Sequence, residues 1–182
     1  MGLMRSSWDV LKKDKELLFF PLLSSICCLL VMASFALPLW GTGYWQPPGQ
    51  EAGLGAEIGY YAVLFAFYFA NYFVIVFFNS AVIACAVKRM QGGDPTVRDG
   101  LRAAAARWHL IVGWALISAT VSTVLRIIED RSSWVASIVA GLLGMAWSVV
   151  TFLAVPVLVV EQTGPVDTFK RSASLLRDTW GQ

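Results

Sequence analysis

Four long stretches without a charged side chain constrain the fold of this sequence more than any other feature. About 20 apolar residues in a helix, each rising about 1.5 Å, cross the hydrocarbon core of a bilayer. Helices of soluble domains instead carry a polar face, so uninterrupted windows of this length predict membrane spans. We expect an all-α, polytopic transmembrane helical bundle that forms a single membrane domain over residues 1–182. Its predicted spans are 17–40, 58–87, 108–125 and 132–160.

The composition agrees with a membrane protein and argues against three other classes. Charged residues make up 14% of the chain, against about a quarter in soluble domains. A net charge of +2 and three cysteines do not favour a disordered chain, a disulfide scaffold or a nucleic-acid partner. A cleaved signal peptide is the alternative interpretation of the first window, but the window is longer than the typical apolar stretch of about 7–15 residues.

The individual windows carry expectations about helix geometry. The stretch 58–87 has 30 residues, more than a perpendicular helix needs, so we expect it to tilt or to project beyond the bilayer. The stretch 108–125 is the shortest and begins beside His109. Pro156 should kink or end the fourth helix, because proline lacks the backbone N–H and clashes with the preceding turn.

Lysine and arginine fall almost entirely on one side of the predicted spans. Cytoplasmic loops of membrane proteins carry an excess of positive charge. Of the 14 basic residues, 12 precede the first span, separate the second from the third, or follow the fourth. Both termini are therefore predicted to be cytoplasmic, in a multi-pass protein of the cell inner membrane.

Three short segments are predicted to be amphipathic helices at the cytoplasmic surface, at about 4–16, 95–107 and 165–180. The second has a helix-start pattern, with Asp94 expected as N-cap and Pro95 in the first turn. Basic residues on such helices suit the anionic inner leaflet, and the simplest interpretation is that they anchor the bundle. Each of the first two segments leads into a pair of spans, whereas no further span follows the third.

Short structural motifs are spread over nearly the whole chain: Arg5–Trp8 with Pro21–Leu23, Gly92–Thr96, Trp147 with Val155–Val157, and Lys170–Ser172 with Trp180–Gly181. In these motifs the chain resembles bacterial polytopic membrane proteins of unknown function, related to the membrane domains attached to some glycerophosphodiester phosphodiesterases. The resemblance implies a six-span protein, so the last hairpin is expected to be missing from this sequence. A pore or site built from all six spans is then not expected.

Small residues at intervals of four predict where helices pack closely, because helices in lipid associate through such seams. The predicted helix-packing residues are Ala62, Ala66 and Ala70 in the second span and Ala136, Ala140, Gly144 and Ser148 in the fourth. The rest of the second span is rich in aromatic rings. Ordinary lipid contact explains these rings, and binding of pigment, quinone or a partner helix is the alternative.

Polar residues within the spans are few, and none of the central ones is ionisable. Interhelical hydrogen bonds explain them adequately, and a solute path is the alternative. The residues of this predicted polar path are Asn71, Asn79, Ser118 and Ser122. With one histidine and no C-x-x-C spacing, we predict no metal, no cofactor and no catalytic residue.

A faint likeness at 99–104 to the metal-binding signature of lipid-head-group alcohol transferases does not alter that prediction. Thr96, Ala104, Ile117 and Val121 replace residues that the signature requires, including three of its carboxylates. Without those three carboxylates there is nothing to hold divalent ions.

We therefore expect a non-catalytic integral membrane protein, an accessory or scaffold subunit of a larger membrane complex such as a respiratory or photosynthetic one. The alternative is a small transporter, channel or lipid-handling protein that acts as an oligomer. The expected partners are the lipid bilayer and either membrane-protein subunits or further copies of the chain, with no nucleic acid.

Overall fold

The structure is a computed structural model that describes residues 15–42, 49, 53–131, 134–160, 164, 167, 168, 170, 171 and 174. Within that part of the chain all regular structure is helical, which confirms the predicted all-α class. The helices are α2 (Lys15–Thr42), α3 (Leu54–Met90), α4 (Val97–Ala106), α5 (Trp108–Arg131) and α6 (Trp134–Val160). The predicted interfacial helix at 4–16 lies almost wholly outside the described residues, as does most of the one at 165–180.

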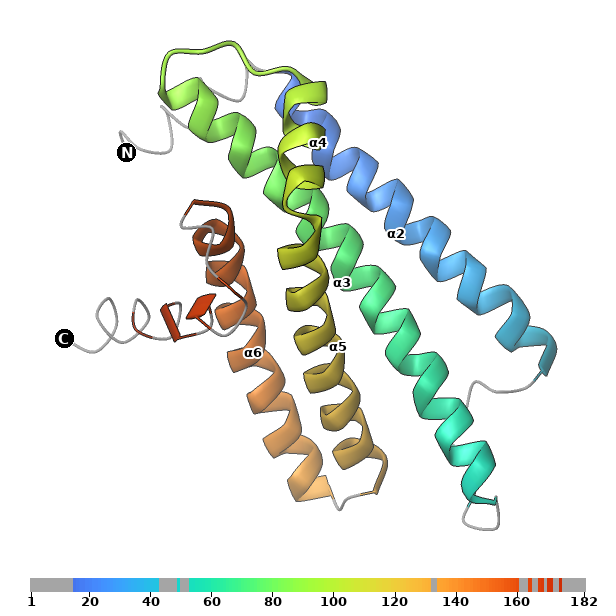
Figure 1. Ribbon diagram of the computed structural model, residues 1–182. Coiled ribbons are helices and arrows are strands. Elements are labelled where there is room, and N and C mark those ends of the chain that lie inside the picture. Colours follow the sequence, from blue (N-terminus) through green and yellow to red (C-terminus); the bar gives the residue numbers. More distant parts are fainter. Residues whose placement is uncertain are drawn as a thin grey trace.

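The four long helices run alternately up and down, and the short α4 sits at one end of the bundle (Figure 1). The central helix is α3, which packs against α2, α4, α5 and α6. We call the end of the bundle that carries α4 the α4 end. The opposite end, where α3 and α6 begin, is the far end.

Four helices in the described residues are long and apolar enough to cross a bilayer: Phe19–Gly41, Leu54–Met90, Trp108–Asp130 and Ile138–Leu158. The chain thus has the helices of a multi-pass membrane protein, as predicted. The 37 residues of α3 extend over about 56 Å, against about 30 Å of hydrocarbon. This helix must therefore tilt or reach past the hydrocarbon, as its uncharged length predicted.

Of the helix ends, that of α5 differs most from the predicted span end. The helix α5 continues to Arg131, because Arg126 pairs along it with Glu129 at 3.6 Å and with Asp130 at 3.1 Å. Helical ion pairs at these spacings support the turn in which the charges lie. Pro156 does not end α6, which runs on to Val160, the predicted end of the fourth span. Neighbouring helices allow a proline inside a membrane helix.

The buried core gathers in the half of the bundle that carries α4. Trp114 of α5 is its largest fully buried side chain, and its ring stacks on Trp147 of α6 with centroids 6.0 Å apart. The other members come from all five helices and are Phe20, Val76, Phe78, Ala81, Cys85, Ala104, Ile111, Ala154, Val155 and Leu158.

Gly100 lets α4 approach the core closely. A Cβ atom on this residue would lie 2.6 Å from Cζ of Phe20, 2.7 Å from Sγ of Cys85 and 3.0 Å from the carbonyl oxygen of Ala81. No side chain fits such a space without movement of its neighbours. A glycine at this position therefore holds α4 against both α2 and α3.

The turn from α3 to α4 is built from local hydrogen bonds. Gly92, with φ +82°, ends α3 in a Schellman motif, in which the Gly93 N–H donates to Lys88 O and the Gly92 N–H to Arg89 O. Ion pairs join Lys88 to Asp99 at 2.9 Å and Arg89 to Asp94 at 2.8 Å. The two basic side chains at the end of α3 are therefore paired with acidic side chains of the turn and of α4.

The start of α4 corrects one prediction, because the N-cap is Thr96 and not Asp94. The Asp99 N–H donates to the Thr96 hydroxyl, and the Asp99 carboxylate accepts from the Thr96 N–H. This capping box satisfies two backbone donors at once, whereas Asp94 is engaged with Arg89.

Candidate functional site

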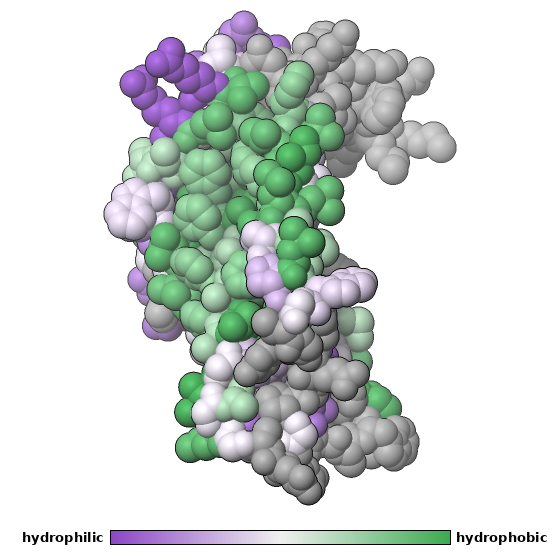
Figure 2. Space-filling view, turned by 90° about the vertical axis from the view of Figure 1, so that its right-hand side faces the viewer, coloured by the Kyte–Doolittle hydropathy of each residue, from purple (hydrophilic) through white to green (hydrophobic). Residues whose placement is uncertain are grey.

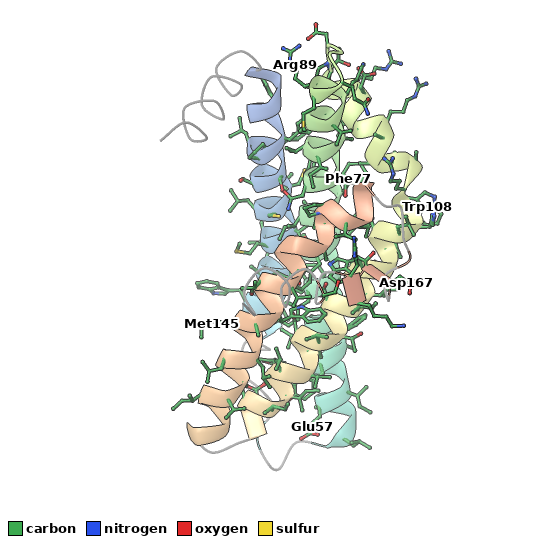
Figure 3. All side chains as sticks on the ribbon, turned by 90° about the vertical axis from the view of Figure 1, so that its left-hand side faces the viewer. Glu57, Phe77, Arg89, Trp108, Met145 and Asp167 are labelled. Atoms are coloured by element: carbon green, nitrogen blue, oxygen red, sulfur yellow. The ribbon has the colours of Figure 1, made fainter. Side chains whose placement is uncertain are left out.

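Two grooves run beside the central helix α3, one on each side. The α2 groove lies between α2 and α3 toward the far end, and the α6 groove lies between α3 and α6 toward the α4 end. Figure 3 shows the α6 side, with Glu57 and Arg89 near the two ends of α3 and Met145 on the outer edge of α6. We treat these two grooves as the candidate site, because binding sites are usually concave. The positions of the predicted functional residues are described relative to them.

The α2 groove is large and almost entirely apolar. Its volume is about 550 Å³, and small residues open it, since a Cβ atom on Gly55 or Gly59 would meet nothing within 4 Å. The face that carries α2 is mainly hydrophobic, with hydrophilic residues gathered near the α4 end (Figure 2). The groove is lined by Met32, Phe35, Ala36, Leu39, Gly55, Ala56, Gly59, Tyr60, Val63, Leu64 and Phe67.

Charged residues at the far end of α5 are held by α3 and by one another. Asp130 pairs with Arg126 and accepts a 3.5 Å hydrogen bond from the hydroxyl of Tyr61. Tyr60, which lines the α2 groove, lies near Arg126. The far end therefore joins α3 to α5 through polar contacts beside the apolar groove.

The α6 groove is similar in size but different in chemistry. Its volume is about 460 Å³. Four of its lining residues carry a hydroxyl or amide among aliphatic neighbours. The α3 residues of the lining are Tyr72, Ile75, Val76, Asn79, Val82 and Ile83, and those of α6 are Ser148, Thr151, Val155 and Pro156.

The two predicted asparagines of α3 differ in how their amides are satisfied. Asn71 is half-buried and donates its Nδ2 hydrogen to the carbonyl of Phe67 at 2.9 Å. Asn79 is exposed on the α6 groove and makes no hydrogen bond with any residue that the structure describes. Asn79 lies about 10 Å along the helix from the middle of the uncharged stretch, which is inside a hydrocarbon core of about 30 Å.

Thr151 adds a second unsatisfied group to this groove. Its Oγ1 is buried and has no hydrogen-bond partner among the described residues, whereas the Ser148 hydroxyl beside it donates to Gly144 O at 2.9 Å. A hydroxyl or amide without a partner in hydrocarbon costs roughly 2–7 kcal/mol, depending on the reference state. Because the Asn79 amide is exposed whereas the Thr151 hydroxyl is buried, it is Asn79 that makes the α6 groove costlier than the α2 groove to leave facing lipid tails.

The two predicted serines both belong to α5. The Ser122 hydroxyl is 2.9 Å from the hydroxyl of Tyr72, which joins the helices by a hydrogen bond. Ser118 is fully buried, and its hydroxyl has no partner in the described part of the chain, as is also true of Ser80. The structure thus brings Ser122 next to the α6 groove through Tyr72 and leaves Asn71 in a local contact.

The predicted helix-packing residues occupy different surroundings. Ala62 and Ala66 are exposed and Ala70 is half-buried. In α6, Ala140 is buried, and a Cβ atom on Gly144 would lie 3.9 Å from Cδ1 of Leu125, at ordinary contact distance from α5. Ser148 is exposed on the α6 groove. The side chain of Ala136 lies outside the described residues.

Thr151 and Tyr72 both line the α6 groove but are not among the predicted residues of the polar path. The spacing of Ser148, Thr151 and Val155 places these residues on one helix face, and that signal would have found Thr151. Tyr72 was hidden within a run of aromatic residues. Its hydroxyl distinguishes it from the neighbouring phenylalanines.

The described residues contain no group of three or more His, Cys, Asp or Glu side chains that could hold a metal ion. The most perturbed acid outside the spans is Asp99, whose pKa lies well below its ordinary value. The hydrogen bond from Lys88 is the largest cause, followed by hydrogen bonds from the backbone and hydroxyl of Thr96. These contacts belong to the α4 cap and contribute to its structure.

Comparison with known proteins identifies a family. The sequence model of a family of unknown function, DUF6159, matches residues 58–182, which include most of α3 and all of α4, α5 and α6. No curated protein and no solved structure matches the chain.

Proposed function

The chain belongs to DUF6159, a family of unknown function, and from this premise we propose that it is a non-catalytic accessory or scaffold subunit of a membrane complex. The observation that carries the proposal is the unsatisfied amide of Asn79, whose carbonyl and N–H groups are exposed on the α6 groove. Lipid tails offer these groups no hydrogen bond, whereas a polar side chain of another membrane helix does.

The exposed apolar area of the bundle is a weaker guide to a partner. Residues such as Leu37, which is 74% exposed, face outward along α2. In a bilayer such side chains contact lipid without cost, because lipid tails are as apolar as leucine. The α6 groove is therefore the surface that we assign to partner binding.

The charged ends of the bundle support a packing role. Lys88 and Arg89 at the α4 end and Arg126 at the far end each pair with acids of the same chain. From the distribution of basic residues we infer that the α4 end and both termini face the cytoplasm at the inner membrane. A relation to the membrane domains of glycerophosphodiester phosphodiesterases stays part of this proposal.

Purification in mild detergent tests the proposed function. We expect the chain to elute in an assembly with a stoichiometric membrane-protein partner or with further copies of itself. Replacing the exposed amide, by Asn79→Leu, should release the chain from that assembly. A monodisperse monomer from native membranes, with no partner at stoichiometric level, would contradict the proposal.

The alternative function, a small transporter, channel or lipid-handling protein, is favoured by one observation. Buried hydroxyls of Ser80 and Ser118 lie in the bundle without a hydrogen-bond partner among the described residues, as expected where a solute or water passes. Flux or lipid scrambling in liposomes checks this function. Activity that survives conversion of both Asn71 and Asn79 to leucine would remove these residues from the path, and a lack of any activity would remove the function.

A further inference from the structure

We propose that the occupant of the α6 groove is a second copy of this chain, in a two-fold dimer in which the Asn79 amides of the two copies hydrogen-bond to each other. This inference rests on the proposed function, because it names the partner that satisfies the same groove. It goes further in assigning the pairing residue and the symmetry.

The chemistry of the asparagine amide favours a second copy. A carboxamide carries both a carbonyl acceptor and two N–H donors, so two of them pair with each other and leave no like charges in contact. In a two-fold dimer the same patch meets itself, which requires a self-complementary group near the axis. Asn79 is such a group, and it makes no hydrogen bond within the described residues.

Depth in the membrane also favours a second copy. Two identical chains inserted in the same orientation bring Asn79 to the same depth in the bilayer, so the two amides meet without any shift along the helix. A different protein would need a polar residue of its own at this depth. A polar residue is costly in hydrocarbon and therefore rare there.

The surroundings of the groove place no obstacle to dimer formation. None of its lining residues is charged. Aliphatic side chains border the amide and offer apolar packing, among them Ile75, which is 40% exposed. At the α4 end, Lys88 and Arg89 already pair with Asp99 and Asp94, which reduces repulsion between two copies.

Energy transfer between donor- and acceptor-labelled chains, in vesicles of phosphatidylethanolamine and phosphatidylglycerol, tests the dimer. We expect transfer for the wild type and a roughly tenfold weaker dimer for Asn79→Leu, equivalent to about 1.4 kcal/mol. Asn79→Gln keeps the amide and should retain most of the association. Asn71→Leu is the matched control, because the Asn71 amide is already bonded to Phe67 O and its loss should leave the dimer unchanged.

Each result bears on the inference in a stated direction. No transfer for the wild type, an unchanged dimer for Asn79→Leu, or equal losses for Asn71→Leu and Asn79→Leu would overturn the second copy as occupant. If the wild type shows no transfer but co-purifies with a different membrane protein in an Asn79-dependent manner, only the dimer fails and the proposed function stands. If neither association exists, both fail.

Discussion

The α2 groove and the α6 groove border the same helix and have similar volumes, about 550 and 460 Å³, but their linings differ. Small and apolar side chains make up nearly all of the first, and the second includes the amide of Asn79 and the unsatisfied hydroxyl of Thr151. In water the larger apolar groove would be the better candidate for a protein interface. In lipid the α6 groove becomes the better candidate, because lipid tails solvate apolar surface but offer no hydrogen bonds to unpaired polar groups.

The support behind the two grooves differs as well. Val76 and Val155 line the α6 groove and also belong to the buried core. On the α2 side, Tyr60 is the only buried residue of the lining. A groove that rests on a packed core presents its polar groups at fixed positions, as recognition of a specific partner requires.

The largest expected effect comes from removing the core beneath the α6 groove. Trp114→Ala would leave a cavity where α5 stacks on Trp147 of α6 and should lower the free energy of unfolding by about 3–5 kcal/mol. Thermal or denaturant unfolding in detergent micelles measures this change. A loss below about 1 kcal/mol would show that the α6 groove does not depend on the core behind it.

One substitution made at two helical glycines sharpens the contrast between packed and open regions. Gly100→Ala would place a Cβ atom within 3.0 Å of Phe20, Cys85 and Ala81 and should cost about 1–3 kcal/mol of stability. Gly59→Ala in the α2 groove meets nothing within 4 Å and should be neutral or stabilising by about 0.5–1 kcal/mol. The same unfolding assay compares the two variants. Equal losses of unfolding free energy would mean that Gly59, like Gly100, is packed closely against neighbouring atoms.

A smaller effect is expected at the cap of α4, which lies away from both grooves. Thr96→Ala removes the N-cap hydroxyl and should cost about 1 kcal/mol, with no change in dimer formation. Circular dichroism during thermal unfolding measures the loss, and energy transfer checks the dimer. Weaker association in this variant would show that the α4 end belongs to the interface.

The same cap predicts a dependence on pH. Because the pKa of Asp99 is lowered in the folded state, its contribution to stability is present above about pH 4 and is lost as pH falls below that value. Asp99→Asn should therefore destabilise the chain at pH 7, and the difference from wild type should narrow in acid. A difference that stays constant from pH 7 to pH 2 would exclude this ion pair and cap as its cause.

Much of the fold could be predicted from the sequence, because uncharged stretches of span length leave a chain few alternatives in a bilayer. The N-cap was misassigned, since Asp94 and Thr96 are both suitable residues. The Asp99 three residues after Thr96 was the signal that separates them. Which of the two asparagines is hydrogen-bonded within the chain could not be predicted, because Asn71 and Asn79 occupy the same uncharged stretch. Which amide remains unpaired depends on the rotamers and on where α6 packs.

Photo-crosslinking from two matched positions of α3 tests the contrast between the grooves most directly. Val63 in the α2 groove and Ile75 in the α6 groove are both β-branched, and they are 39% and 40% exposed. With a photoreactive amino acid at each position in native membranes, we predict protein adducts from Ile75 and lipid adducts alone from Val63. Protein adducts that are equal at the two positions, or that come mainly from Val63, would contradict the assignment of the α6 groove as the protein-binding surface.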